Sequence, residues 1–172
     1  MKKTLVLIIA TFSILSCKQP EPDLTTNFIG TWTAPISSKS VEAQGQNINT
    51  YQSVGYISWK IEKGSGNKVK ISSNQVSTNT SITKNQAGTT LRSSADSYTA
   101  KFFIADITVS SSNQFSINEA VISNYAFNNL TNIQYVTIVG TGTLTGTNLS
   151  VLMKVTDNKT SQTETISLDF VR

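Results

Sequence analysis

The chain has 172 residues, enough for one domain of ordinary size. Its formal net charge is only +4 and charged residues make up 14% of the sequence, so a broad basic surface for nucleic acid is not expected. One cysteine and no histidine leave no internal disulfide, no Ser-His-Asp triad and no usual zinc ligands. We therefore expect a protein without metal or cofactor that is not an enzyme.

The first sixteen residues are typical of a secretion signal. Lys2 and Lys3 precede a nearly continuous apolar run over residues 5–15. As a helix this run would be about 16 Å long, about half of a bilayer's hydrocarbon core. It is therefore predicted to be the apolar region of a signal peptide and not a transmembrane span.

The segment Ile14-Leu15-Ser16-Cys17 follows this run and resembles the lipobox of bacterial lipoproteins. The resemblance implies cleavage before Cys17, a diacylglycerol on its thiol and an acyl chain such as palmitate on its new amino group. Two or three fatty chains give a stable membrane anchor, whereas one is marginal. Because Lys18 follows where an Asp would favour inner-membrane retention, the resemblance implies the outer membrane, with the leaflet left open. The alternative is an ordinary signal peptide with an incidental cysteine.

The chain after the signal divides into two parts. Residues 17–26 contain the cysteine and two prolines, and are predicted to form an extended spacer of roughly 3 Å per residue. Residues 27–172 show no second change of composition and are predicted to form a single domain.

Two-residue alternation of apolar and polar side chains dominates this domain, and helical periodicity is almost absent. Apolar residues share one face of successive strands, as in Ile57/Trp59/Ile61, Ala100/Phe102/Ile104, Leu149/Val151/Met153 and Ile166/Leu168/Phe170. The pattern predicts an all-β meander of antiparallel strands. Open sheet edges aggregate, so such a meander is expected to close into a β-barrel or to pair into a β-sandwich.

Three segments interrupt the alternation. Residues 72–95 are almost wholly Ser, Thr, Asn and Gln with scattered aliphatics, and are interpreted as a weak edge strand or a long loop. Residues 123–132 place apolar side chains among asparagines and are interpreted as a loop. Residues 64–67 are a predicted hairpin turn, and the lysines around it are interpreted as a solvated tip in preference to an anion site; these are Lys60, Lys63, Lys68 and Lys70.

The segment Phe28-Ile29-Gly30-Thr31-Trp32 resembles the opening motif of the lipocalin and calycin superfamily. The resemblance implies an up-and-down antiparallel barrel of about eight strands, in which Gly30 and Trp32 are structural and Arg172 lies across the Trp32 ring at the floor. The loop signature of that superfamily is only loosely matched by Asp96-Ser97-Tyr98. A β-sandwich is the alternative fold.

The glycine-rich segment 140–146 suggests a nucleotide-binding loop at first sight. The third glycine of a dinucleotide fingerprint would fall at Thr145, and no helix is predicted to follow. We interpret this segment as a strand that bends at its glycines.

The leading hypothesis is a membrane-anchored barrel that binds a small hydrophobic ligand. Candidate lining residues are those that alternation turns inward and those of the apolar loop: Trp59, Ile61, Ile71, Phe102, Ile104, Tyr125 and Phe127. If the barrel is filled, the same side chains pack against one another.

Two other classes of protein stay open. In a module that binds surface glycans or proteins, exposed aromatic rings would stack on sugars or anchor a partner; the candidates are Tyr51, Tyr56, Tyr98 and Tyr125. An envelope scaffold would have no small ligand. Glycoside hydrolysis would need a pair of carboxylates, and the spacing of Glu62, Asp106 and Glu119 does not single out a pair.

Overall fold

The computed structural model describes residues 22–172, which contain eight β-strands and no helix. The predictions for the signal and for Cys17 lie outside these residues. The strands are β1 (Gly30–Gln44), β2 (Asn47–Lys63), β3 (Lys68–Asn85), β4 (Thr90–Ser111), β5 (Gln114–Phe127), β6 (Leu130–Thr145), β7 (Asn148–Asp157) and β8 (Thr163–Val171).

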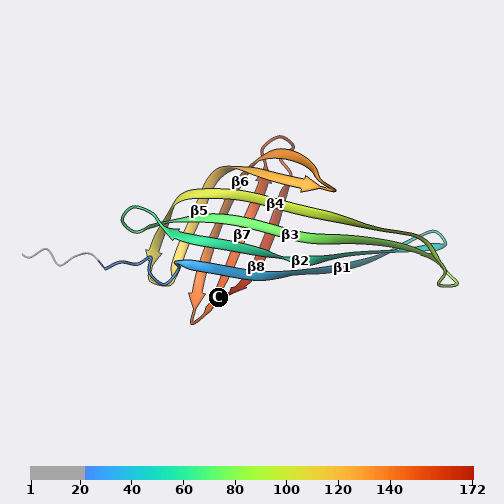
Figure 1. The fold of residues 1–172 in the computed structure, drawn as a ribbon, viewed down its shortest axis with the longest axis horizontal. Coiled ribbons are helices and arrows are strands. Elements are labelled where there is room, and N and C mark those ends of the chain that lie inside the picture. The colour runs from blue at the N-terminus through green and yellow to red at the C-terminus, as the bar shows by residue number, and fades with distance from the viewer. Residues whose placement is uncertain (1–21) are drawn as a thin grey trace, which may run out of the picture.

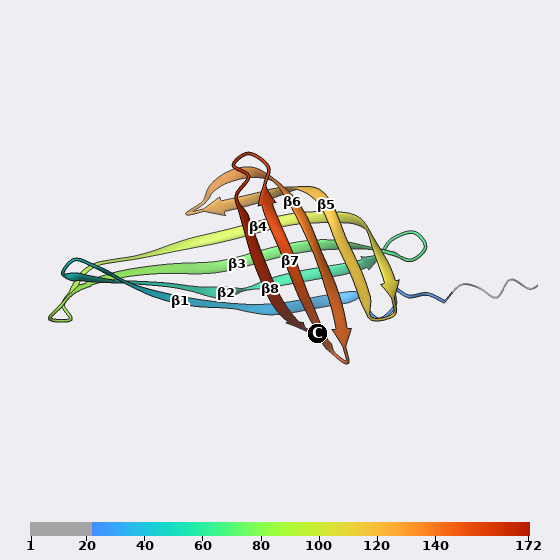
Figure 2. The same ribbon diagram turned by 180° about the vertical axis from the view of Figure 1, so that it is seen from behind.

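The eight strands form one closed, antiparallel, up-and-down barrel in the order β1 to β8, so the alternative of a β-sandwich is wrong (Figures 1 and 2). Neighbouring strands are joined by short turns, and residues 64–67 form the predicted hairpin turn. The seam that closes the barrel is short, with Thr33 opposite Val171 as its one pair. A second irregularity lies between β4 and β5, where pairing is interrupted between Lys101 and Thr108.

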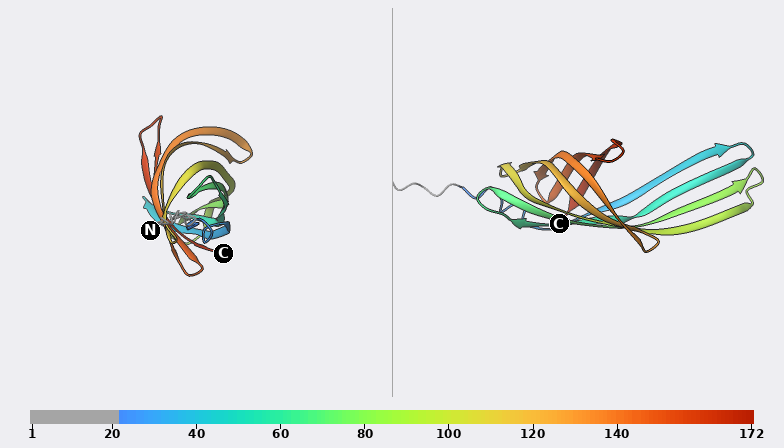
Figure 3. Two further views of the ribbon diagram at one scale, coloured as in Figure 1. Left: turned by 90° about the vertical axis from the view of Figure 1, so that its left-hand side faces the viewer. Right: turned by 90° about the horizontal axis from the view of Figure 1, so that it is seen from above.

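Strands β1 to β4 are much longer than the barrel is tall. Beyond the barrel they continue as a flat four-stranded sheet, which we call the blade and define as residues 37–54 and 77–97 (Figure 3). Asn49 and Ser77 are its only buried side chains, so both of its faces are largely open to solvent. The chain enters the barrel at residue 22 from the end opposite the tip of the blade (Figure 1).

The barrel floor is filled with large side chains. Trp32, Trp59 and Phe170 are each at most 1% exposed, and the rings of Trp59 and Phe170 lie 4.7 Å apart. The Trp32 indole donates a hydrogen bond to the Phe28 carbonyl at 2.7 Å. Arg172 covers the other side of this Trp, with its guanidinium carbon 4.7 Å from the ring centre.

The polar segment 72–95 is neither an edge strand nor a long loop. It forms most of β3, a short turn and the start of β4, and β3 is paired along its whole length with β2, from Asn47↔Asn85 to Lys63↔Val69. The segment has no apolar alternation because both blade faces meet water, and its many threonines suit a strand.

The loop predicted over residues 123–132 is also wrong. It is the tip of the β5–β6 hairpin, with a two-residue turn at Asn128 and Asn129. Their φ angles of 48° and 66° are those of a type I′ turn, a backbone that asparagine tolerates. Apolar residues such as Leu130 are exposed in this tip because it projects beyond the core.

Candidate functional site

The barrel interior is divided into a filled half and a hollow half. Above the floor lies a cavity of about 770 Å³, within the range of roughly 300–1,000 Å³ that is usual for small-molecule sites. Its apolar wall includes Ile57, Phe102, Val136, Ile138, Met153 and Leu168. The cavity exists because the large aromatic residues are concentrated at the floor, while smaller side chains such as Ala100 and Ser77 line the upper half.

Polar side chains gather at the mouth of the cavity, where β1–β4 continue into the blade. Asp157 lies there and accepts hydrogen bonds from the Gln134 amide at 2.7 Å and from the backbone N–H groups of Lys159 and Thr160. The Gln134 bond and these backbone bonds lower the pKa of Asp157, so its carboxyl is ionised at neutral pH. Glu164 adds a second carboxylate to the lining.

Tyr98 lines the same mouth, and its ring lies 6.4 Å from that of Tyr125, tilted by 32°. Burial raises the pKa of Tyr98, and Tyr125 and Glu164 add to the effect. The Tyr98 phenol is therefore neutral at physiological pH and available as a hydrogen-bond donor.

The candidate lining residues separate into three groups. Phe102 lines the cavity. Trp59, Ile61, Ile71 and Ile104 are buried in the filled floor, because inward-pointing side chains near the closed end meet one another before they can border a space. The Tyr125 ring lies 6.4 Å from that of the cavity-lining Tyr98, and Phe127 lies outside the barrel in a groove on the blade.

Phe102 also marks a thin place in the barrel wall. It borders both the cavity and an outer hollow of about 710 Å³ that includes Phe103 and Ile122. The outer hollow lies where β4 and β5 are not paired, so a side chain and not a hydrogen-bonded ladder closes the wall there.

Two buried polar atoms lie in the layer beneath the cavity. The Trp59 indole N–H and the Ser73 hydroxyl have no hydrogen-bond partner within residues 22–172. Trp59 and Ser73 pair across β2 and β3, two residues along from the cavity-lining pair of Ile57 and Gln75. Buried polar groups normally have partners, so these two would gain free energy from a water molecule or a ligand oxygen.

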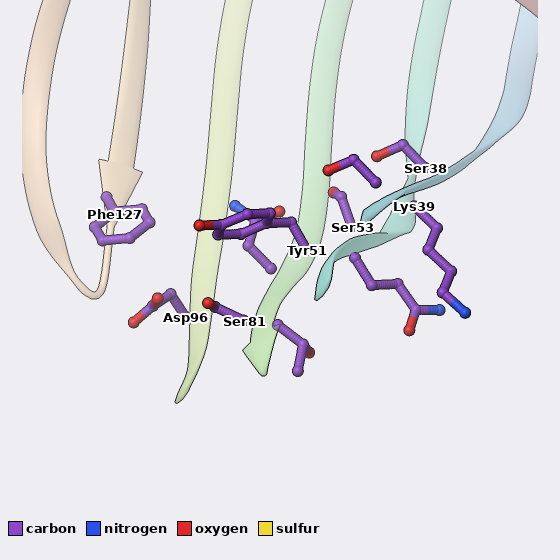
Figure 4. Close-up of a pocket in the computed structure, with 11 residues that line it drawn as sticks. Ser38, Lys39, Tyr51, Ser53, Ser81, Asp96 and Phe127 are labelled. Carbon is purple, nitrogen blue, oxygen red and sulfur yellow. The ribbon is translucent and has the colours of Figure 1, made fainter. Parts of the chain in front are cut away.

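A groove of about 420 Å³ lies on the blade, which we call the blade groove (Figure 4). Hydroxyl and amide side chains of β1–β3 line it, among them Ser38, Ser53, Asn79 and Ser81, and β4 adds Asp96. The Tyr51 side chain extends from β2 across the neighbouring strands toward Phe127, which comes from the β5–β6 hairpin (Figure 4). Tyr51 is 42% exposed and Phe127 is 41% exposed, so both rings are available for contact.

The position of Phe127 is fixed by its neighbour in the turn. The Asn128 amide donates to the Asp96 carboxylate at 2.6 Å, and its oxygen accepts the backbone N–H of Ser97 at 3.0 Å. The Asn128 backbone N–H also donates to the Ser97 carbonyl. These three bonds join the hairpin tip to β4 and hold Phe127 at the edge of the blade groove. The alternation pattern did not predict this groove, because the groove forms where the hairpin tip with Phe127 meets the blade, and a pattern within one strand does not show that contact.

The cavity and the blade groove adjoin. Ser53 and Asn79 line both of them, so the cavity mouth opens onto the groove. Sequence reasoning named Tyr51 and Tyr98 as exposed rings, and the structure places Tyr51 in the groove and Tyr98 at the mouth. Tyr56 lies on the opposite face of β2, since successive side chains of a strand alternate between its faces and Tyr56 follows Tyr51 by five positions, an odd number.

The carboxylates considered for catalysis are dispersed. Glu62 is exposed on β2 and paired with Lys60, Asp106 is at an irregularity of β4 with a φ of 59°, and Glu119 is on β5. None of them lines the cavity or the blade groove. Within residues 22–172 no three His, Cys, Asp or Glu side chains gather as metal ligands would.

Residues 22–172 contain no helix with the length and apolarity that a membrane crossing needs. No family model, curated protein or solved structure matches this chain.

Proposed function

We propose that this protein is a lipid-anchored, non-enzymatic binding protein whose barrel holds a small hydrophobic ligand. The observation that carries the proposal is the cavity of about 770 Å³ above the filled floor. Apolar side chains of β2, β4, β6, β7 and β8 form one part of its lining, and about half of the lining residues are polar, from Gln75 beside Ile57 to Asp157 and Glu164 at the mouth. Apolar surface combined with convergent polar groups is the usual composition of a small-molecule site.

Titration with a fluorescent twelve-carbon probe tests this proposal. Residues 22–172 contain the whole closed barrel and its core, and this part of the chain is used for the titration. Ala100 lines the cavity, so Ala100→Phe fills the space and is expected to weaken binding at least tenfold while the fold is retained. Ala105→Phe, on an exposed position of the same strand, is the matched control. Absence of saturable binding to the unsubstituted barrel would overturn the proposal.

The anchor belongs to the same proposal and rests on the lipobox resemblance. The chain enters the barrel at its floor. An anchor at Cys17 would therefore place the floor toward the membrane, with the cavity mouth and the blade pointing away from it. Cys17→Ser is expected to move the protein to the soluble fraction or to leave the signal uncleaved. A variant that partitions with membranes as the original protein does would contradict the anchor.

A second candidate function is glycan binding at the blade. The observation that favours it is the groove in which the Tyr51 and Phe127 rings face a floor of hydroxyl and amide groups. Aromatic faces bind the apolar C–H faces of sugars, and the polar side chains satisfy sugar hydroxyls. Glycan-array binding that is lost in Tyr51→Ala and retained in Tyr56→Ala would support this function, and no binding to any glycan would oppose it.

A further inference from the structure

We infer that the cavity and the blade groove form one site for an amphiphile with a single alkyl chain and an uncharged, hydroxyl-rich head group. This inference rests on the proposed function and adds the chemical class of the ligand. It requires that the two hollows adjoin, that the groove suits a sugar-like head, and that charges at the mouth oppose an anionic head.

The two hollows adjoin at their shared lining. Ser53 and Asn79 pair across β2 and β3 and border both hollows. A chain packed on the apolar wall of the cavity can leave it past these two side chains. A head group attached to that chain would then lie on the blade, on the face that carries Tyr51.

The groove is suited to an uncharged polar head. On the face that carries Tyr51 it is lined by the Asn79 amide and by serine hydroxyls, which both donate and accept hydrogen bonds as sugar hydroxyls do; the serines are Ser38, Ser40, Ser53 and Ser81. The Tyr51 and Phe127 rings bound it (Figure 4). Phe127 is held in place by the bonds of Asn128 to β4, so this wall is largely organised before a ligand arrives.

The charges around the opening favour the same class. Asp157 and Glu164 line the mouth, and Asp96 lines the groove. Among residues 22–172, Lys39 is the one basic side chain that borders either hollow, and alternation assigns it to the opposite face from Ser38 and Ser40. A carboxylate or sulfate head would therefore meet like charges, although solvent screens part of the repulsion.

Calorimetric titration with four probes below their micelle concentrations tests the inference. These are dodecyl maltoside, tetraethylene glycol monododecyl ether, dodecanoate and maltose. Dodecyl maltoside is expected to bind roughly fivefold tighter than the ether, because contact of its sugar head group with the aromatic wall of the groove increases the affinity by about this factor. Dodecanoate is expected to bind roughly tenfold more weakly than dodecyl maltoside. Maltose alone is expected to show no saturation at millimolar concentration.

Variants on one strand separate the contribution of the head group to the affinity from the contribution of the alkyl chain. Tyr51→Ala is expected to reduce the affinity for dodecyl maltoside to that for the ether and to leave the ether unaffected. Tyr56→Ala, similarly exposed on the other face of β2, is the control and should change neither. If Tyr51→Ala alters the circular dichroism spectrum, Phe127→Ala replaces it with the same expectation.

The outcomes distinguish the inference from the function on which it rests. Equal binding of dodecyl maltoside and the ether, or tighter binding of dodecanoate, would overturn the inference while cavity binding stands. Tight binding of maltose alone would also overturn it, because the groove would then act without the cavity. If no dodecyl probe binds, the proposed function itself fails and the inference fails with it.

Discussion

At the scale of single residues, the barrel floor depends on Trp32. This side chain is 1% exposed, donates from its indole to the Phe28 carbonyl, and lies under the Arg172 guanidinium. Arg172 in turn donates to the carbonyls of Asn27 and Ile29, so the last residue of the chain is fixed to the segment before β1. The five-residue opening motif therefore acts through contacts at both ends of the chain.

Trp32→Ala is expected to lower the free energy of unfolding by about 3–5 kcal/mol, since a large buried aromatic is replaced by a cavity. Arg172→Ala is the comparison and should cost about 1 kcal/mol, because the cation–π contact is partly exposed. Chemical denaturation measures both. A Trp32→Ala loss no larger than that of Arg172→Ala would contradict the central place of this indole in the floor.

The glycines of the segment 140–146 have a packing explanation. A Cβ on Gly142 would lie 2.2 Å from the Phe115 ring, and one on Gly140 would lie 2.5 Å from the Leu152 carbonyl oxygen. Gly142 is directly opposite Phe115 in the β5–β6 pair, so its missing side chain makes room for that ring. The interpretation as a strand agrees with β6 over residues 140–145, and Gly146 lies in the turn to β7 with a φ of 60°.

Gly142→Ala is accordingly expected to cost about 1–3 kcal/mol, the usual range for overpacking a well-packed interior. Thr141→Ala, at an exposed neighbouring position, should change stability by less than about 0.5 kcal/mol. Thermal and chemical denaturation of both variants provide the measurement. If Phe115 causes the strain, Phe115→Leu should restore part of the loss in the Gly142→Ala background, and an unchanged loss would argue against this cause.

At the scale of elements, the β5–β6 hairpin is held to the blade by one turn residue. Asn128 combines a φ of 48° with side-chain bonds to Asp96 and Ser97. Because the contact joins positions about thirty residues apart, alternation within either strand did not reveal it. It decides where Phe127 lies and therefore the shape of the blade groove.

Two substitutions separate the backbone role of Asn128 from its side-chain role. Asn128→Gly keeps the positive φ and loses the side-chain bonds, whereas Asn128→Ala loses both. Both are expected to speed hydrogen exchange at the Ser97 amide, and Asn128→Ala should in addition cost about 1 kcal/mol of stability through the strained turn. Unchanged exchange at Ser97 in both variants would show that the side chain does not fix the hairpin.

At the scale of the whole molecule, acidic side chains stabilise both ends of the barrel. Asp23 near the floor pairs with Lys63 and accepts bonds from the Thr25 hydroxyl and N–H. The Lys63 and Thr25 hydrogen bonds lower the pKa of Asp23 to about 2. At the mouth, the bonds from Gln134 and the turn backbone lower the pKa of Asp157.

A carboxyl whose pKa is lower in the folded state than in the unfolded state contributes stability above the unfolded pKa of about 4. That contribution is lost as pH falls through the folded pKa. We expect the denaturation midpoint to fall between pH 4 and pH 2. Asp23→Asn and Asp157→Asn should be less stable than the original protein at pH 7 and approach it at pH 2. Parallel pH profiles for the variants and the original protein would contradict this assignment.

The amino-acid sequence by itself determined that the domain is all-β and antiparallel. It left a barrel and a sandwich open, and the closed barrel of eight strands was decided by the tertiary structure. Alternation with a period of two residues indicates which side chains face the interior. Short turns between successive strands favour the pairing of each strand with the next one along the chain. Alternation failed over residues 72–95 and 123–132, because a strand with both faces in water needs no apolar face. In those segments pairing with β2 and an Asn-Asn turn determine the conformation instead.

Only the tertiary structure decided which inward side chains touch and which border a space. Trp59 and Phe102 have the same inward orientation in sequence, yet Trp59 is packed in the floor and Phe102 lines the cavity. The difference depends on the height of each residue in the barrel and on the side chains that face it from strands far away in sequence. No local pattern contains that information, because a cavity is a property of residues that several strands bring together.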